Sequence, residues 1–259
     1  MKYYFLSLVI TLSICFSPLF LYPAYSQTDE FESSLNGTDP TEPRTRFDAY
    51  LTRIEPLASG YVLQTTASGD YAFKDWFSIG MEVPLVYANF PSTVTFEIGD
   101  IQLNGLFALF TTKKQASFKR VAAGFVAYLN TGNVDTGTGF GQHIIAPYLG
   151  AAFYPAPEIM VTPIIEEYIS LDRNEENRAK HDLSLRLNTT LTIDEVWVAI
   201  VPELFIDLLG YDKSLWNLRS SLGIMINANM GFSAEFISQL AGEKRFNYLG
   251  RIHFNYLLN

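Results

Sequence analysis

Residues 77–87 read FSIGMEVPLVY, and every odd-numbered position in this stretch is a large apolar residue. The even-numbered positions include Ser78, Gly80 and Glu82. Side chains on a β-strand point alternately to opposite faces of the sheet, so a period of two residues predicts a strand with one apolar and one polar face. The same rhythm recurs along most of the chain and predicts an all-β protein.

The first 26 residues have the features of a secretory signal peptide. Lys2 precedes an apolar run over residues 4–21, and Ala24-Tyr25-Ser26 forms a small-x-small cleavage site. Ser17 and Pro18 interrupt the run. This favours cleavage over the alternative, retention as a membrane helix.

Composition limits the classes of protein that remain after residues 1–26 are removed. The chain's only cysteine is Cys15, so we expect neither disulfides nor a thiol nucleophile in the exported protein. The formal net charge of −9 disfavours nucleic acids and anionic membrane surfaces as partners. Charged residues make up 17% of the chain, against about 25% in a typical soluble domain, while aromatic residues reach 15%.

After the predicted signal peptide, the chain has no uninterrupted apolar run of the roughly 20 residues that a membrane helix needs. A closed β-barrel pairs every backbone polar group and is the other structure that can cross a bilayer. The sequence therefore predicts a closed antiparallel transmembrane β-barrel of the outer-membrane type, with about twelve strands. The predicted location is the outer membrane of a diderm bacterium.

The chain is predicted to form one domain behind a lead segment. Residues 27–43 are polar and acidic and are predicted to be a flexible periplasmic lead, while residues 44–259 form the barrel. The expected strands are 44–54, 61–68, 76–88, 99–112, 118–130, 143–154, 158–171, 182–193, 196–208, 216–229, 231–240 and 246–258. Residues 44–54 also fit an amphipathic helix, because Phe47, Tyr50 and Leu51 share one helical face.

The predicted connections include a short class and a long class, and in the second half of the chain the two alternate as outer-membrane barrels require. The short ones are 113–117, 155–157, 194–195 and Met230, and the long ones are 89–98, 131–142, 172–181, 209–215 and 241–245. This alternation places the short turns and both chain termini on the periplasmic side.

The distribution of lysine indicates which face of the wall meets water. A soluble lipocalin-like barrel or a sandwich would alternate in the same way, but its solvated outer wall should carry lysine along the strands. After the signal peptide, every lysine lies in a predicted connection or at a strand end: Lys74, Lys113, Lys114, Lys119, Lys180, Lys213 and Lys244. The apolar face is therefore predicted to meet lipid and the polar face to line a narrow lumen.

The middle of the chain resembles a family of outer-membrane barrels named for the meta-pathway of phenol degradation. The resemblance is carried by Gly99-Asp100-Ile101, Leu129-Asn130-Thr131-Gly132, Thr138-Gly139-Phe140-Gly141 and Pro147. It covers residues 76–157, and Asn130 departs from the family pattern, which has proline before Thr-Gly. The resemblance implies a transporter-type barrel that passes small hydrophobic or aromatic compounds, with no catalytic residues.

Charged and polar residues at inward positions are the candidate lumen-lining residues. They are Glu82, Arg120, Glu166, Arg186, Glu203, Arg219, Glu235, Arg251 and His253. Arginines and carboxylates that face one another across a constriction would select solutes by charge and size. The open alternative is that the same side chains pair as plugs inside a closed barrel.

No motif predicts catalysis or a bound metal. His143, His181 and His253 have no nucleophile at a spacing that identifies a catalytic pair, and Glu166 and Glu167 point to opposite faces of a strand. The sequence has no phosphate loop, dinucleotide motif or metal-spaced cluster, so we expect no catalytic residue, no cofactor and no metal.

We therefore predict a non-enzymatic, porin-like outer-membrane barrel for the passive passage of small, hydrophobic or aromatic solutes. A closed barrel with a structural or adhesive role is the alternative, and a barrel-embedded hydrolase comes third. The expected partners are outer-membrane lipids, the solute and the barrel-insertion machinery. The apolar face of the last strand, with Phe254 and Tyr256, resembles the assembly signal that this machinery recognises.

Overall fold

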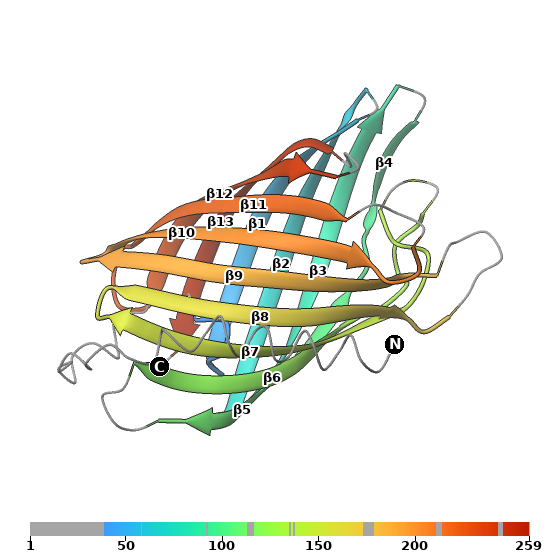
Figure 1. Ribbon diagram of the computed structural model, residues 1–259. Helices are drawn as coiled ribbons and strands as arrows, with labels where there is room; N and C mark the ends of the chain where they lie inside the picture. The colour runs from blue at the N-terminus through green and yellow to red at the C-terminus, as the bar shows by residue number, and fades with distance from the viewer. Residues whose placement is uncertain are drawn as a thin grey trace.

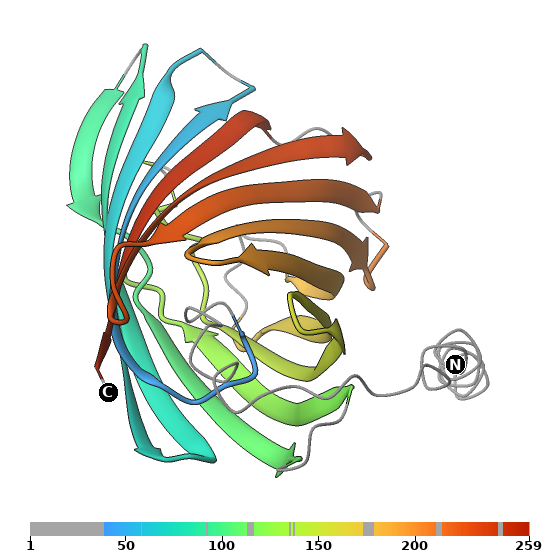
Figure 2. The ribbon, with the colours of Figure 1, turned by 90° about the vertical axis from the view of Figure 1, so that its left-hand side faces the viewer.

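The computed structural model describes residues 39–57, 59–91, 93–112, 117–134, 136, 138–172, 179–210, 214–242 and 246–258. The predicted signal peptide and residues 27–38 of the predicted lead lie outside the described residues. The described chain is built from strands that surround one common axis (Figures 1 and 2). Its described part contains no helix that is long and apolar enough to cross a membrane.

The strands form a single antiparallel sheet that closes on itself. They are β1 (Thr45–Pro56), β2 (Tyr61–Lys74), β3 (Phe77–Phe90), β4 (Thr93–Ile98), β5 (Gln102–Thr111), β6 (Phe118–Tyr128), β7 (Ile144–Ala156), β8 (Ile159–Ser170), β9 (His181–Ile193), β10 (Val196–Asp207), β11 (Leu215–Met225), β12 (Met230–Ala241) and β13 (Phe246–Leu258). β1 pairs with both β2 and β13, and β2 pairs with β3, which closes the ring. β4 pairs with β3 alone among the described strands, so the closed barrel has twelve strands, as predicted.

The segment that also fitted a helix is the strand that closes the barrel. Every β1 residue from Arg46 to Ile54 is paired on both sides, with β13 and with β2. These two ladders satisfy the backbone N–H and C=O groups of β2 and β13 that face β1. A helix in this place would leave those groups without hydrogen-bond partners. Tertiary pairing therefore overrides the helical spacing of the apolar residues.

Several strand limits differ from those expected from the sequence. β2 continues past the predicted end at Ser68 to Lys74, because Asp70 pairs in register with Gly80 and is an inward wall residue, not a loop residue. The predicted loop 89–98 is a hairpin of β3 and β4, and the predicted strand 99–112 begins only at Gln102. Met230, predicted as a turn, begins β12.

The two faces of the wall differ in chemistry. Outward side chains are apolar and exposed, such as Phe236 at 51% and Ile252 at 59%. Inward side chains are polar, and Asp48, Ser184 and Glu203 are almost completely buried. A monomeric soluble protein rarely exposes a contiguous apolar surface of this kind, whereas a lipid-facing barrel wall requires it.

Gly124 lies where the lumen wall packs closely against the ring of Tyr148. A Cβ atom at this position would lie 2.3 Å from Cζ of Tyr148 and 2.5 Å from the backbone oxygen of Gly105. We expect Gly124→Ala to lower the free energy of unfolding by about 1–3 kcal/mol, because the ring and the wall must both shift. Gly250→Ala is the control, because no atom lies within 4 Å of a Cβ there. Equal losses for the two variants in urea unfolding would contradict this packing.

Candidate functional site

Alternating charges cross neighbouring strands on the lumen side of the barrel. Arg186 of β9 donates to Glu166 of β8 at 2.5 Å, and its Nε lies 3.8 Å from Glu203 of β10. Arg219 of β11 donates to the other oxygen of Glu203 at 3.1 Å. The side chain of Glu203 is fully buried, whereas Arg186 and Arg219 remain 23% and 26% exposed. Glu203 therefore holds two arginines that still reach the lumen.

The same alternation continues on the last two strands. Glu235 of β12 lies 3.5 Å from Arg251 of β13, and Arg251 Nε donates to Thr52 of β1 at 3.1 Å. Glu235 and Arg251 are directly opposite in the strand register, as are Arg186 and Glu203. Opposite charges in such cross-strand pairs stabilise a sheet. We call Glu166, Arg186, Glu203, Arg219, Glu235 and Arg251 the charge ladder.

A second set of charges lies on the wall formed by β1, β2 and β3. Arg46 donates to Asp70 at 2.6 Å and lies 3.2 Å from Asp48. Asp48 is buried and contacts Nε2 of His253 at 2.9 Å. Glu82 lines the cavity nearby and forms no ion pair with another described residue.

His253 is held between neighbouring strands. Its Nδ1 lies 3.5 Å from Oγ of Ser233, its Nε2 contacts Asp48, and its ring stacks on Tyr50 with centroids 4.5 Å apart. The sequence did not identify Asp48 and Ser233 as its partners, because cross-strand register cannot be seen in residue spacing. Within the described ranges, no group of three His, Cys, Asp or Glu side chains could hold a metal ion.

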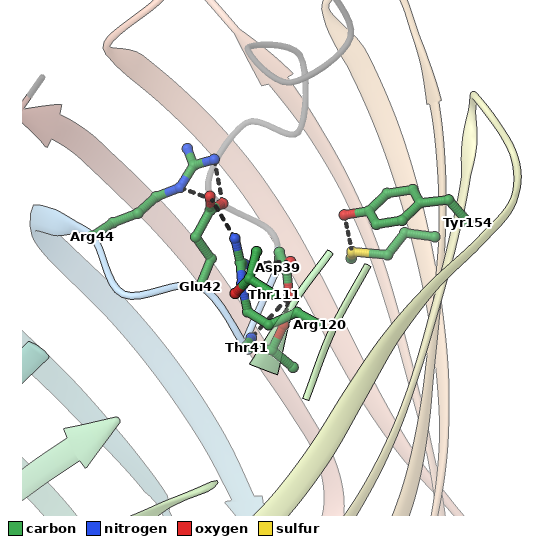
Figure 3. A network of polar contacts seen from close by, with 8 residues as sticks. Asp39, Thr41, Glu42, Arg44, Thr111, Arg120 and Tyr154 are labelled. Carbon is green, nitrogen blue, oxygen red and sulfur yellow. Dashed lines mark hydrogen bonds and ion pairs between the residues drawn. The ribbon is translucent and has the colours of Figure 1, made fainter. Parts of the chain in front are cut away.

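Arg120 lies apart from the charge ladder and contacts the chain that precedes β1. Its guanidinium lies 3.2 Å from Oδ2 of Asp39 and 3.2 Å from Oε1 of Glu42 (Figure 3). Asp39 and Thr41 are almost completely buried. Residues 39–43 were expected to belong to a flexible lead. They lie instead inside the barrel, where Asp39 and Glu42 pair with the buried Arg120. Burial raises the pKa of Asp39, although hydrogen bonds from Thr41 and the charge of Arg120 act in the opposite direction.

The three glycine-containing segments that carry the family resemblance meet around Asp100. Its Oδ1 accepts hydrogen bonds from the backbone N–H groups of Thr131 and Gly132, at 3.2 and 2.9 Å, and its Oδ2 accepts one from Phe140 at 2.6 Å. A Cβ atom at Gly139 would lie 2.7 Å from Asp100 Oδ1, so glycine is required for this close approach. This motif therefore fixes the long connection between β6 and β7.

Two cavities are bounded by lumen side chains in the described part of the chain. The larger, of about 450 Å³, is bounded in part by residues of the segment before β1. Its other lining residues include Arg46, Glu82, Glu166, Arg186, Arg219, Arg251, Tyr50, Tyr128, Tyr148 and Tyr168. The smaller, of about 200 Å³, is lined by Trp197, Glu235, His253 and Asn255 among others. Glu203 and Arg120 line neither of these two cavities. Glu203 positions Arg186 and Arg219, and Arg120 binds Asp39 and Glu42.

Comparisons with solved structures identify the fold. An outer membrane channel from Pseudomonas putida F1 has a TM-score of 0.65 and 10% identity, with 85% of this chain and 98% of that chain covered. The NanC porin has a TM-score of 0.59 and 9% identity, with 82% of this chain and 99% of that chain covered. The KdgM porin has a TM-score of 0.57 and 12% identity, with 83% and 99% covered.

At these identities the likeness establishes the fold as an outer-membrane barrel. A scan against models of protein families finds no match. A search of curated proteins finds none either. Membership of the phenol-degradation family therefore stays a prediction.

Proposed function

We propose that this protein is an outer-membrane channel for the passive passage of small polar solutes. The observation that carries this proposal is the charged, tyrosine-lined cavity of about 450 Å³ within a closed barrel whose outer wall is apolar. A polar interior behind an apolar wall suits a water-filled path across a bilayer. The likeness to an outer membrane channel and to two porins supports the same class of function.

The charge ladder supports selection of solutes by charge and size. Arg186 and Arg219 line the larger cavity and keep about a quarter of their side-chain surface exposed, at 23% and 26%. Permeating solutes would therefore touch these guanidinium groups. The alternating charges along one wall create strong local fields at the lumen surface, which favour solutes that carry a dipole or hydrogen-bonding groups.

A second candidate is the passage of aromatic solutes, which the family resemblance implies. Tyr50, Tyr128, Tyr148 and Tyr168 line the larger cavity, and the rings of Tyr128 and Tyr168 have centroids 6.2 Å apart. Such rings stack on aromatic molecules. Ionised side chains surround them, so we infer that an aromatic solute would carry hydroxyl or carboxyl groups, because a purely apolar one would desolvate these charges.

Liposome swelling tests the channel directly. Proteoliposomes placed in iso-osmotic solutions of small sugars or amino acids should swell faster than protein-free liposomes, and the rate should fall as solute size rises. The folded state is verified beforehand by the anomalous migration of the unheated protein on a detergent gel. No swelling from a correctly folded sample would favour the closed, structural barrel.

Substitution of Glu82 tests charge selection without breaking an ion pair of the barrel wall. Glu82 has no direct ion pair among the described residues, so Glu82→Gln should leave the free energy of unfolding almost unchanged. In a tenfold salt gradient, we expect the reversal potential to move toward anion selectivity by about 10 mV, because one negative charge leaves the cavity. Asp75→Asn, in the turn between β2 and β3, is the matched control. An unchanged potential in Glu82→Gln would exclude Glu82 from the permeation path.

The proposed location is the outer membrane, with lipid against the apolar wall. We further propose that the barrel-insertion machinery recognises β13, on which Ile252, Tyr256 and Leu258 are exposed on the outer face. Fractionation of cells should recover the protein with outer membranes. Recovery with the soluble fraction would contradict this location.

A further inference from the structure

The chain that precedes β1 lies inside the ring of strands and not beside it. In Figure 2 the start of the described chain, in blue, lies within the barrel before it enters β1. Asp39 and Glu42 pair with Arg120 of β6, and Thr41 lies beside Gly150 of β7. Both strands lie several strands away from β1 around the ring. Residues 39–44, which we call the strap, therefore cross the interior to reach another part of the wall.

The strap is docked by charge. Arg120 of β6 donates to Asp39 and to Glu42, both at 3.2 Å, and its Nε lies 3.4 Å from Oγ1 of Thr111 on β5. Only 7% of the Arg120 side chain is exposed. Glu42 also accepts a hydrogen bond from Arg44 at 2.7 Å (Figure 3). A buried arginine whose described ion pairs are both with the strap acts as a receptor for it.

The strap also fits the wall sterically. Thr41 is 2% exposed. Its N–H and its hydroxyl both donate hydrogen bonds to Asp39, at 2.8 and 2.6 Å, which fixes the conformation of the strap. A Cβ atom at Gly150 of β7 would lie 3.5 Å from Cγ2 of Thr41. Thr41 therefore packs against a part of β7 that has no side chain.

The docking differs from the bonding that builds the barrel. No backbone ladder joins the described strap to a strand, and the wall within the described ranges contains no strand before β1. The strap can therefore leave its position without breaking a strand pair. The docked strap is held by the two ion pairs of Arg120, and the cost of taking these charges out of water offsets part of their attraction.

We propose that the strap is an intramolecular plug that narrows the channel, and that Arg120 is its receptor. This inference rests on the proposed function, because a plug has a meaning only in a conducting barrel. Asp39, Pro40, Glu42 and Arg44 all line the larger cavity, so the docked strap takes up part of the path that the cavity provides. Release of the strap from Arg120 would open the larger cavity toward the end of the barrel where Arg120 lies.

Single-channel recording in planar bilayers tests the plug through its charges. In Asp39→Asn/Glu42→Gln and in Arg120→Gln, the open-state conductance should rise about twofold or more, because the strap leaves the lumen. Asp75→Asn, which removes one negative charge from the exposed turn between β2 and β3, is the control and should behave like the wild type. Detergent-gel migration of the unheated proteins confirms that each variant is folded.

The outcomes separate the plug from the channel. A conducting wild type with unchanged conductance in both strap-releasing variants would overturn the plug and leave the channel. A wild type that conducts little and variants that conduct well would support both. Absence of conductance in all folded samples would overturn both.

A reversible cross-link provides an independent test. Thr41→Cys/Gly150→Cys places two thiols at a contact that the structure positions closely, and the one natural cysteine, Cys15, lies in the predicted signal peptide. In the Arg120→Gln background, oxidation should hold conductance at the low level of the docked strap, and reduction should restore the higher level of Arg120→Gln. The single-cysteine variants should not respond to oxidant. A cross-linked protein that conducts as well after oxidation as after reduction would contradict the plug.

Discussion

Glu203→Gln should lower the free energy of unfolding by about 3 kcal/mol. The Glu203 carboxylate is fully buried and contacts both Arg186, at 3.8 Å, and Arg219, at 3.1 Å. The neutral amide leaves two inward guanidinium groups without the carboxylate that balances them, and it places an amide donor against a cation. Urea unfolding in detergent or liposomes measures this loss.

Glu235→Gln is the matched control for Glu203→Gln. Glu235 has the same chemistry and a place in the charge ladder, but 20% of its side chain is exposed and it lies 3.5 Å from a single arginine. Its loss should be about 1 kcal/mol or less, because lumen water replaces the contact. Equal effects of the two variants would mean that Glu203 does not organise the ladder.

Asp100→Ala should release the connection between β6 and β7. The Asp100 carboxylate accepts three backbone hydrogen bonds, of 2.6 to 3.2 Å, and bonds to a charged group are worth about 1.5–3 kcal/mol each. We expect hydrogen exchange at Thr131, Gly132 and Phe140 to accelerate by about 100-fold, which corresponds to roughly 3 kcal/mol of local stability.

Asp172→Asn is the control for the loop. Asp172 accepts one described backbone hydrogen bond, from His143 at 2.7 Å, so its replacement should leave exchange at Thr131 to Phe140 unchanged. Retained protection in Asp100→Ala would show that the glycine-rich sequence orders the loop without the carboxylate.

The sequence predicts the barrel well because its wall repeats one simple physical rule. Alternation such as that of residues 77–87 determines both the strand and its two faces, and the ordering of short and long connections predicts the ring of twelve. The inward arginines and carboxylates could be predicted for the same reason. The two-residue period identifies the face of Arg186 or Glu203 without knowledge of its neighbours.

Contacts between strands could not be predicted in the same way. The order Glu166, Arg186, Glu203, Arg219 becomes a connected ladder only through the register of β8 to β11, which local pattern does not determine. The pairing of Asp48 with His253 depends equally on the closure between β1 and β13. Position in the ring, and not residue type, selects these partners.

The strap has the composition of a solvated lead, which is why it was predicted as one. Asp39, Pro40 and Glu42 carry no periodic signal, and their burial follows from the position of Arg120, far away in sequence. The hairpin of β3 and β4 differs from the prediction for another reason. Residues 93–98 alternate polar and apolar side chains as a strand does, but the ordering of short and long connections assigns them to a loop, and pairing with β3 makes them a strand.

Single-channel recording of the folded wild-type protein tests most directly whether the barrel is an open polar channel. A sample that migrates anomalously when unheated should produce discrete conductance steps in a planar bilayer, with ion selectivity that shifts when Glu82 is neutralised. A folded sample that inserts into the bilayer without any conductance step would contradict the channel.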